Sequence, residues 1–365
     1  MISFHRPREG PPFLGTFPLR NLGGLPYFHS TLRQGLYGYF LRAGRQRALL
    51  PDFCPEGIYA PLRDAGLKIA FYGVGPDLSL DRGGLRRMVE SFRPDVFLYI
   101  HHFGLRLEGN LRLVRESLNP GTLLVEDLAH TLPEWGFGPP TAPDFGDLAL
   151  YAFPKLLGVA EGGLLLFRRA DPAATVPYGP ESGPGRTLAR RLEAHLAYEN
   201  WVRRLRLSPR LQSLLRHFVG KRADYYGHLM RHYRDIASPV SAASLRVLER
   251  VDFQAIGARR RAVATQYWEG LDPRFRLGPP REAYLQAPLL AFPIKVDDQD
   301  RFHAHLAKAG VLGFRLTDRW WFPPEAPGAL YHGHYLLPMG HHLGDGEIRA
   351  VIARANLYPK AQRAR

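Results

Sequence analysis

The sequence predicts a mixed α/β protein with a mostly parallel central sheet in a large domain and a smaller α/β domain after it. Two observations support this prediction. Between Ala48 and Tyr99, strand-like apolar runs alternate with helix-like runs, and this alternation is typical of parallel strands joined by crossover helices. The chain also has 365 residues, which is long enough for a large core and two lobes.

The first elements follow from local signals. Residues 1–26 are rich in Pro, Gly and Phe without periodicity, so we expect an irregular arm packed on the surface or on a partner subunit. Residues 28–42 contain a Ser/Thr cap followed by a helix with apolar spacing. The alternating region then predicts strands at 48–50, 68–74 and 95–100, with helices near 57–65 and 84–91.

Lys155 lies between two apolar runs, Leu148–Phe153 and Leu164–Phe167. Gly and Pro bound both runs, which predicts two buried strands joined by a loop. If Lys155 is buried there, its pKa falls and it becomes a nucleophilic amine suited to Schiff-base chemistry. The alternative is an ordinary surface lysine with its ammonium in water, and these residues by themselves favour that alternative.

The preceding segment, residues 121–132, predicts a strand that ends near Glu126, Asp127 and His130. Carboxylates at the C-terminal end of a buried strand point toward the crevice where open α/β sheets bind ligands. Enzymes that use pyridoxal 5'-phosphate (PLP) need a lysine and an acidic partner that keeps the pyridine nitrogen protonated. Asp127 and Lys155 are candidates for that pair.

The segments VEDLAHTL and GDLALYAFPKLLGVAEGGLLLF resemble the aspartate and cofactor-lysine block of the DegT/StrS family of sugar aminotransferases. RALLPDFCPEGIYAPLRDAGLKIAFYGVGPDLSLD, SLRVLERVDFQAIGARRRAVATQYWEGL and YLLPMGHHLGDGEIRAVIARA resemble further segments of the same family. Together they span most of residues 28–357. The resemblance implies the aspartate aminotransferase fold, PLP as cofactor, and a homodimer with active sites at the subunit interface.

The resemblance also assigns roles to three residues. Lys155 would form the internal aldimine with PLP and then act as the base that shuttles a proton. Asp127 would keep the pyridinium charged, and His130 would help to orient the ring near its oxygen. The substrate that the resemblance implies is a keto-sugar linked to a nucleotide, with an amino acid such as glutamate as donor.

Phosphate binding is implied at the turn that contains Thr31, Arg33 and Gln34, because helix N-termini bind anions. Two positions depart from the family pattern: Leu32 replaces a glycine, and Ala152 stands where a phosphate-binding serine is common. The alternative for this turn is a capping threonine and a solvated arginine.

Four further residues are candidates for the site. Phe53 is the first candidate to stack on the pyridine ring and His102 the second. Arg315 and Arg319 lie where such enzymes receive the anionic side of the substrate, and each can bind an anion with two hydrogen bonds. Both arginines are equally consistent with surface ion pairs.

The second half of the chain predicts an arginine-rich amphipathic helix at 187–219, docked on the large domain. We expect a large domain at 27–240 and a small domain at 241–365. The small domain would contain a helix at 241–271, a strand at 289–296, a helix at 300–309 and a terminal helix at 343–354.

Composition limits the alternatives. The net charge is +15 and the pI about 10.1, which is typical of nucleic-acid binding, yet no nucleic-acid module is evident. The positive residues are nearly all arginine, so the charge is as consistent with a compositional preference as with a binding surface. In the second case it would help to attract a phosphorylated substrate or cofactor. No apolar run approaches a membrane span and the N-terminus lacks a signal-peptide core, so we expect a cytoplasmic protein without membrane contact.

Cysteine and histidine content also bear on the chemistry. The single cysteine, Cys54, excludes an intrachain disulfide and a multi-cysteine metal site. Four histidines, at 332, 334, 341 and 342, lack the spacing and carboxylate of a credible metal site, so no metal is predicted.

The sequence thus favours a PLP-dependent aminotransferase. A related PLP dehydratase stays open. So does a protein that keeps the fold for sensing or assembly without transaminase activity, which Leu32, Ala152 and the absence of an aromatic residue after Cys54 would favour.

Overall fold

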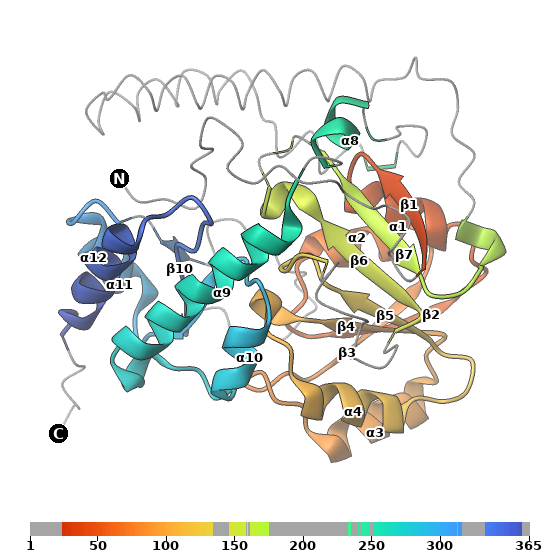
Figure 1. Ribbon diagram of the computed structural model, residues 1–365. Helices are drawn as coiled ribbons and strands as arrows, with labels where there is room; N and C mark the ends of the chain where they lie inside the picture. Colours follow the sequence, from red (N-terminus) through yellow and green to blue (C-terminus); the bar gives the residue numbers. More distant parts are fainter. Residues whose placement is uncertain are drawn as a thin grey trace.

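The computed structural model describes residues 24–133, 146–157, 159, 161–174, 233–234, 240, 242–248, 251–311, 313–315 and 333–359. These residues form a large lobe around a seven-stranded sheet and a smaller lobe around a three-stranded sheet (Figure 1).

The large sheet has the strand order β1-β7-β6-β5-β4-β2-β3. β7 is antiparallel to both of its neighbours, while the pairs from β6 to β3 are parallel. The carboxyl ends of the parallel strands therefore meet at one edge. The strands are β1 (Leu25–His29), β2 (Arg47–Pro51), β3 (Lys68–Tyr72), β4 (Val96–Ile100), β5 (Leu123–Asp127), β6 (Leu148–Ala152) and β7 (Gly163–Phe167).

Helices cover both faces of this sheet. α1 (Leu32–Phe40) and α2 (Glu56–Asp64) pack on one face, where they share a core with Val125 of β5. α3 (Arg82–Phe92) and α4 (Glu108–Ser117) pack on the other. Because helices cover both faces of the sheet, β4 and β5 are buried along their whole length.

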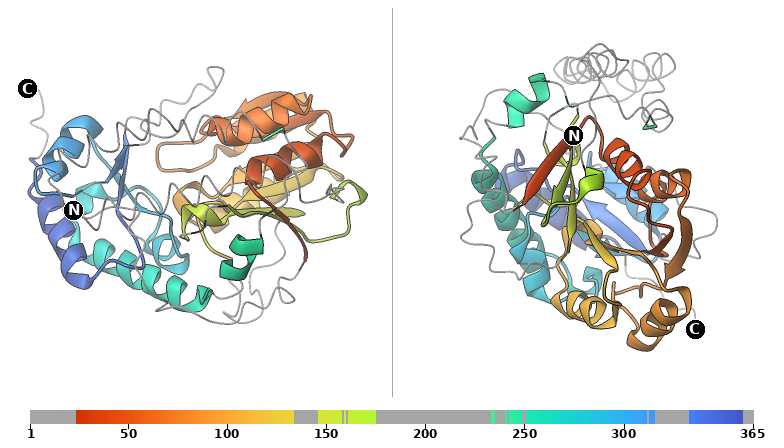
Figure 2. Two further views of the ribbon diagram at one scale, coloured as in Figure 1. Left: turned by 90° about the horizontal axis from the view of Figure 1, so that it is seen from above. Right: turned by 90° about the vertical axis from the view of Figure 1, so that its right-hand side faces the viewer.

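The smaller lobe has the strand order β8-β10-β9, with both pairs antiparallel. Its strands are β8 (Phe292–Lys295), β9 (Phe314–Arg315) and β10 (His334–Leu337). Its helices are α10 (Arg281–Gln286), α11 (Gln299–Ala307) and α12 (Asp345–Asn356). The long helix α9 (Phe253–Gly270) runs from the large sheet to this lobe in every view (Figure 2).

The two lobes share apolar packing. One hydrophobic cluster contains Phe97 of β4, Tyr267 of α9 and Phe302 of α11, all completely or almost completely buried. A continuous core of this kind fixes the smaller lobe against the α3 and α4 face of the large sheet.

Most of the predicted elements are confirmed, with shifts of a few residues at their ends. One prediction was wrong: the helix expected at 241–271 is broken into α8 (Ala242–Leu248) and α9. Asp252 begins α9, because its side chain accepts a hydrogen bond from Ala255 N at 2.9 Å.

Two further differences concern elements that were not predicted. Leu25 and Pro26 belong to β1, which pairs with β7, rather than to an irregular arm. α4 was also not predicted. The rest of the arm and the 187–219 segment lie outside the described residues. None of the described helices is both long and apolar enough to cross a membrane.

Candidate active site

The candidate site lies where β4, β5 and β6 end. β5 ends at Asp127 and β6 at Ala152, and these adjacent parallel strands pair Asp127 with Leu150. The chain leaves β6 through a short 3-10 turn, Phe153–Lys155. The sheet therefore brings Asp127 and Lys155 to the same edge, as the sequence predicted.

Lys155 is the last residue of this turn. The turn is closed by hydrogen bonds from Leu156 N and Leu157 N to Phe153 O, at 3.1 and 2.8 Å. The residue is half-buried. Burial of the amine lowers the pKa of Lys155; the Asp127 charge partly opposes this shift and the Arg33 charge adds to it. The lowered pKa favours the neutral, nucleophilic amine over the surface-lysine alternative.

Asp127 is buried, and its Oδ1 accepts a hydrogen bond from Ala129 N at 2.8 Å. Within the described part of the chain, its Oδ2 accepts no hydrogen bond. Burial raises the pKa of Asp127, and Lys155 and the Ala129 amide partly offset that rise. Asp127 and Lys155, both described, interact electrostatically without a contact ion pair. One oxygen is thus fixed by backbone while the other can receive a proton donor.

His130 follows Asp127 by three residues and is buried. Its Nδ1 accepts a hydrogen bond from Phe103 N at 3.2 Å. Burial, with the charges of Lys155 and His102, holds the pKa of His130 well below its ordinary value. The ring is therefore neutral, and because Nδ1 is an acceptor, its proton is on Nε2.

The turn that supplies this amide is strained. Phe103 has φ 63°, in the left-handed region that non-glycine residues rarely adopt, and Gly104 follows with φ 92°. A Cβ on Gly104 would lie 2.5 Å from His130 O. The strain and the close approach both serve to place Phe103 N against His130.

The start of α1 forms a second part of the site. Gln34 N donates to Thr31 Oγ1 at 3.2 Å, and Thr31 N donates to Gln34 Oε1 at 3.1 Å, which is a reciprocal capping box. Ser30 Oγ also bonds Gln34 Oε1. The side chains of Thr31 and Gln34 are thus bonded to the helix start itself.

Arg33 is oriented differently. Its guanidinium lies so close to Gly57, in the first turn of α2, that a Cβ on that glycine would be 2.6 Å from Arg33 Nη2. The Arg33 charge also lowers the pKa of Lys155, after burial. Of the three residues predicted to bind phosphate, Arg33 is the one whose guanidinium lies against α2 and whose charge acts on Lys155.

Two glycines let α1 approach the sheet. Gly162 donates from N to Ser30 O at 2.9 Å, and a Cβ on Gly163 would lie 2.2 Å from Leu32 N. Gly163 pairs with Ala152, the last residue of β6. The Gly-Gly sequence before β7 is therefore what allows the start of α1 to sit beside the end of β6.

Phe53 and His102 pack against each other, with ring centroids 4.7 Å apart. Both are buried, and Phe53 also contacts His334 of β10 at 6.0 Å. Burial, then His334 and His101, lowers the pKa of His102 to about 3. The rings thus join the strand ends to the smaller lobe, and the assignment of a stacking residue stays a prediction.

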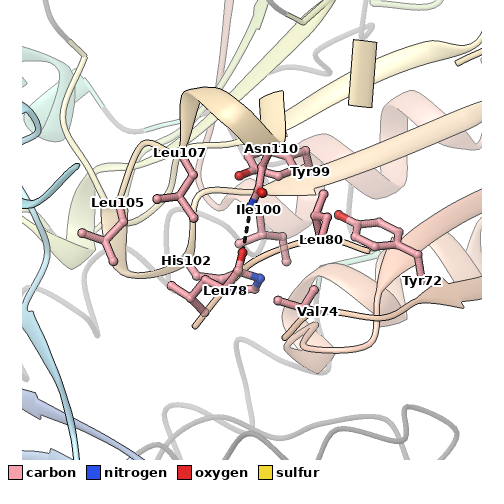
Figure 3. Close-up of a pocket in the computed structure, with 10 residues that line it drawn as sticks. All are labelled: Tyr72, Val74, Leu78, Leu80, Tyr99, Ile100, His102, Leu105, Leu107 and Asn110. Atoms are coloured by element: carbon pink, nitrogen blue, oxygen red, sulfur yellow. Dashed lines mark hydrogen bonds between the residues drawn. The ribbon is translucent and has the colours of Figure 1, made fainter. Parts of the chain in front are cut away.

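A small hollow lies behind His102, with about 260 Å³ of space not filled by atoms (Figure 3). Asn110 Nδ2 donates to Leu78 O across it at 2.7 Å. Its lining is mostly apolar and includes none of Lys155, Asp127 and His130. The polar edge therefore defines the candidate site better than this hollow does. The lining residues are Tyr72, Val74, Leu78, Leu80, Tyr99, Ile100, His102, Leu105, Leu107 and Asn110.

Of the two arginines predicted to bind substrate, the structure describes one. Arg315 Nη1 contacts Asp300 Oδ1 of α11 at 2.5 Å, so its guanidinium is already ion-paired. Arg319 lies outside the described residues. Among the residues that are described, no three His, Cys, Asp or Glu side chains are grouped as metal ligands would be.

Arg260 of α9 was missed by sequence reasoning. It is buried, and its Nη1 donates to Leu289 O and Met339 O, both at 2.7 Å. Its Nη2 reaches Leu156 O, next to Lys155, at 3.5 Å. Arg260 therefore ties the lysine turn to the smaller lobe. It is one of three consecutive arginines, and no sequence signal separates it from the other two.

The fold is shared with solved aminotransferase structures. No protein-family model matches the chain, and no curated protein matches its sequence. The aminotransferase TlmJ from Streptoalloteichus hindustanus is similar with a TM-score of 0.60 and 19% identity, over 98% of each chain. A sugar aminotransferase candidate of Streptococcus pneumoniae, solved in its PLP form, has a TM-score of 0.60 and 14% identity, over 98% of this chain and 97% of that one.

A third structure is DesI, solved in the presence of its TDP-sugar product. It has a TM-score of 0.59 and 18% identity, over 93% of this chain and 82% of that one. At these identities the likeness shows the fold, which is that of the PLP-dependent aminotransferases.

Proposed function

We propose that this chain is a PLP-dependent aminotransferase that moves an amino group from an amino acid onto a keto-sugar carried by a nucleotide. The observation that carries the proposal is the pair Asp127 and Lys155, which follow adjacent strands at one edge of the sheet. Two of the similar structures support it: a sugar aminotransferase candidate solved in its PLP form, and DesI, solved in the presence of its TDP-sugar product.

The residues present fit PLP. Asp127 Oδ2 can receive a proton donor such as a protonated ring nitrogen. Lys155 offers an amine with lowered pKa, burial being the main cause. Arg33 brings a cation to the start of α1, where a phosphate would be favoured by the free amides and positive end of the helix. When bound, PLP supplies an electron sink that stabilises negative charge on the substrate carbon.

Each residue then has a defined task. Lys155 would hold the cofactor through Nζ, and the same amine would accept and return the proton of the substrate carbon. Asp127 keeps the ring nitrogen protonated. His130, neutral with its proton on Nε2, is suited to donate toward the ring oxygen.

Other parts of the proposal rest on the family resemblance. They are a homodimer, domains at 27–240 and 241–365, and glutamate as the amino donor. The cytoplasmic location is proposed from the sequence, which has no apolar run of membrane-span length and no signal-peptide core at its N-terminus. Arg315 would contribute to substrate binding only after exchanging its bond to Asp300 for one to the substrate.

The test is spectroscopic and chemical. The purified protein with PLP should show a visible absorption band that shifts when an amino donor is added, and borohydride should fix the label on Lys155. A label on another lysine would refute the assignment. If the protein shows a stable band but no nitrogen passes from the donor to the sugar, the result would instead favour the sensing or dehydratase alternatives.

A further inference from the structure

A buried, hydrogen-bonded histidine–glutamate pair lies next to Asp127 in the sheet. His101, the residue after β4, contacts Glu126 of β5 with 2.9 Å between Nε2 and Oε2. Both side chains are almost completely buried. The other oxygen of Glu126 accepts a hydrogen bond from Gly146 N at 2.6 Å, and Arg168 Nη2 lies 3.8 Å from it.

The Glu126 side chain is on the opposite face of the sheet from the Asp127 side chain. Side chains alternate along a strand; Leu124 belongs to the α3 and α4 core and Val125 to the α1 and α2 core. Glu126 therefore lies on the face of Leu124, and Asp127 on the face of Val125. The proposed reaction does not use Glu126, yet a buried carboxylate is costly unless it is paired and hydrogen-bonded.

His101 nevertheless contacts the Asp127 backbone. His101 N donates to Asp127 O at 3.1 Å, next to the pairing of Ile100 with Asp127. The same residue thus holds Asp127 by its main chain and Glu126 by its ring. Its Nδ1 is buried, with no hydrogen-bond partner in the described structure, so Nε2 and Glu126 determine the orientation of the ring.

We infer that His101 and Glu126 form a positioning unit that fixes the end of β5, so that the Asp127 carboxylate meets the cofactor ring at the right place. This inference rests on the proposed function. The electrostatics of Asp127 support the inference. Burial raises the pKa of Asp127, and the charges of Lys155 and His101 both act to lower it.

Glu126→Gln is the first test variant, since it keeps the shape but removes the charge. With Asp127 less firmly placed, the ring nitrogen holds its proton less well and withdraws less electron density. The pH midpoint of the visible cofactor band should then rise by roughly half a unit or more, and the cofactor should dissociate several-fold faster. His101→Asn should act in the same direction.

His305→Asn is the matched control. His305 Nε2 bonds Arg354 O at 2.8 Å in the smaller lobe, so its loss should lower the melting temperature without moving the band midpoint. If the Glu126→Gln midpoint equals the wild-type value, the inference is wrong. It is also wrong if neither variant folds with the cofactor, because the pair is then only structural.

The two proposals fail differently. If borohydride labels a lysine other than Lys155 in the wild-type protein, the proposed function is lost. If Lys155 is labelled but the pH midpoint of the cofactor band is the same in the wild type and in the Glu126 and His101 variants, only the positioning unit is refuted.

Discussion

The ends of β5 and β6 and the start of α1 both contribute to the candidate site, but their side chains are used in different ways. At the strand ends, Asp127 keeps one oxygen available and Lys155 keeps a reactive amine. At the helix start, Thr31 and Gln34 bond each other. Groups at the strand ends are held by the sheet and left for chemistry, while polar groups at the helix start are needed by the helix itself.

The largest test of this contrast is Lys155→Ala. Covalent cofactor attachment should be lost completely, as measured by borohydride reduction and mass spectrometry. The fold should remain, since a half-buried turn residue leaves little cavity when it is truncated. Lys68→Ala, at the exposed start of β3, is the control that should retain attachment. Full attachment in the Lys155 variant would contradict the assignment.

Asp127→Asn should retain the cofactor but slow single-turnover transamination. A neutral amide cannot hold the ring nitrogen protonated, and loss of such preorganised electrostatics costs on the order of 3 kcal/mol, or about 10²-fold. Asp52→Asn is a matched control, because Asp52 follows β2 and accepts a hydrogen bond from Val74 N at 3.0 Å. Equal rates in the Asp127 variant and the wild type would remove Asp127 from the site.

Arg33→Ala tests the side chain of the α1 turn whose charge acts on Lys155. Cofactor affinity should fall about tenfold or more, as expected for roughly 1.5–3 kcal/mol from a hydrogen bond to a charged group. Equilibrium dialysis measures it. Arg42→Ala, which removes a bond to Ala173 O near the other end of α1, should leave affinity unchanged. Ala152→Ser should increase cofactor affinity. If neither the Arg33 nor the Ala152 substitution changes cofactor affinity, the phosphate binds elsewhere.

Thr31→Ala should have the smallest effect on cofactor binding and a clear effect on stability. Loss of the cap lowers the free energy of unfolding by about 1 kcal/mol, which a denaturant titration detects. Thr31→Ser keeps the hydroxyl and should retain most of the wild-type free energy of unfolding. If Thr31→Ala instead weakens cofactor binding as much as Arg33→Ala, the contrast between the two regions is wrong.

Sequence patterns were sufficient for the parts of the fold that depend on local signals. Apolar runs bounded by Gly and Pro predicted β6 and β7, and the Thr31 cap predicted α1. β1 was not predicted because a five-residue edge strand containing Pro26 has no signal of its own. It becomes a strand only by pairing with β7.

The site was predicted in part for the same reason. Asp127 and Lys155 follow recognisable strands, so their meeting could be expected. The bond between His101 and Glu126 joins residues on neighbouring strands, and its place on the far face depends on the register of β4 and β5. The amide that sets the His130 tautomer comes from a strained turn at Phe103. No local pattern indicates either contact.

The bonds of Arg260 have a consequence for biosynthesis. The lysine turn leaves the ribosome long before Arg260, and Met339 follows later still, although all three meet in the finished protein. The strands of the large sheet can pair while the tether to Leu156 O is still missing. Until residues 260 and 339 have both been synthesised, the turn that carries Lys155 would lack this link to the smaller lobe.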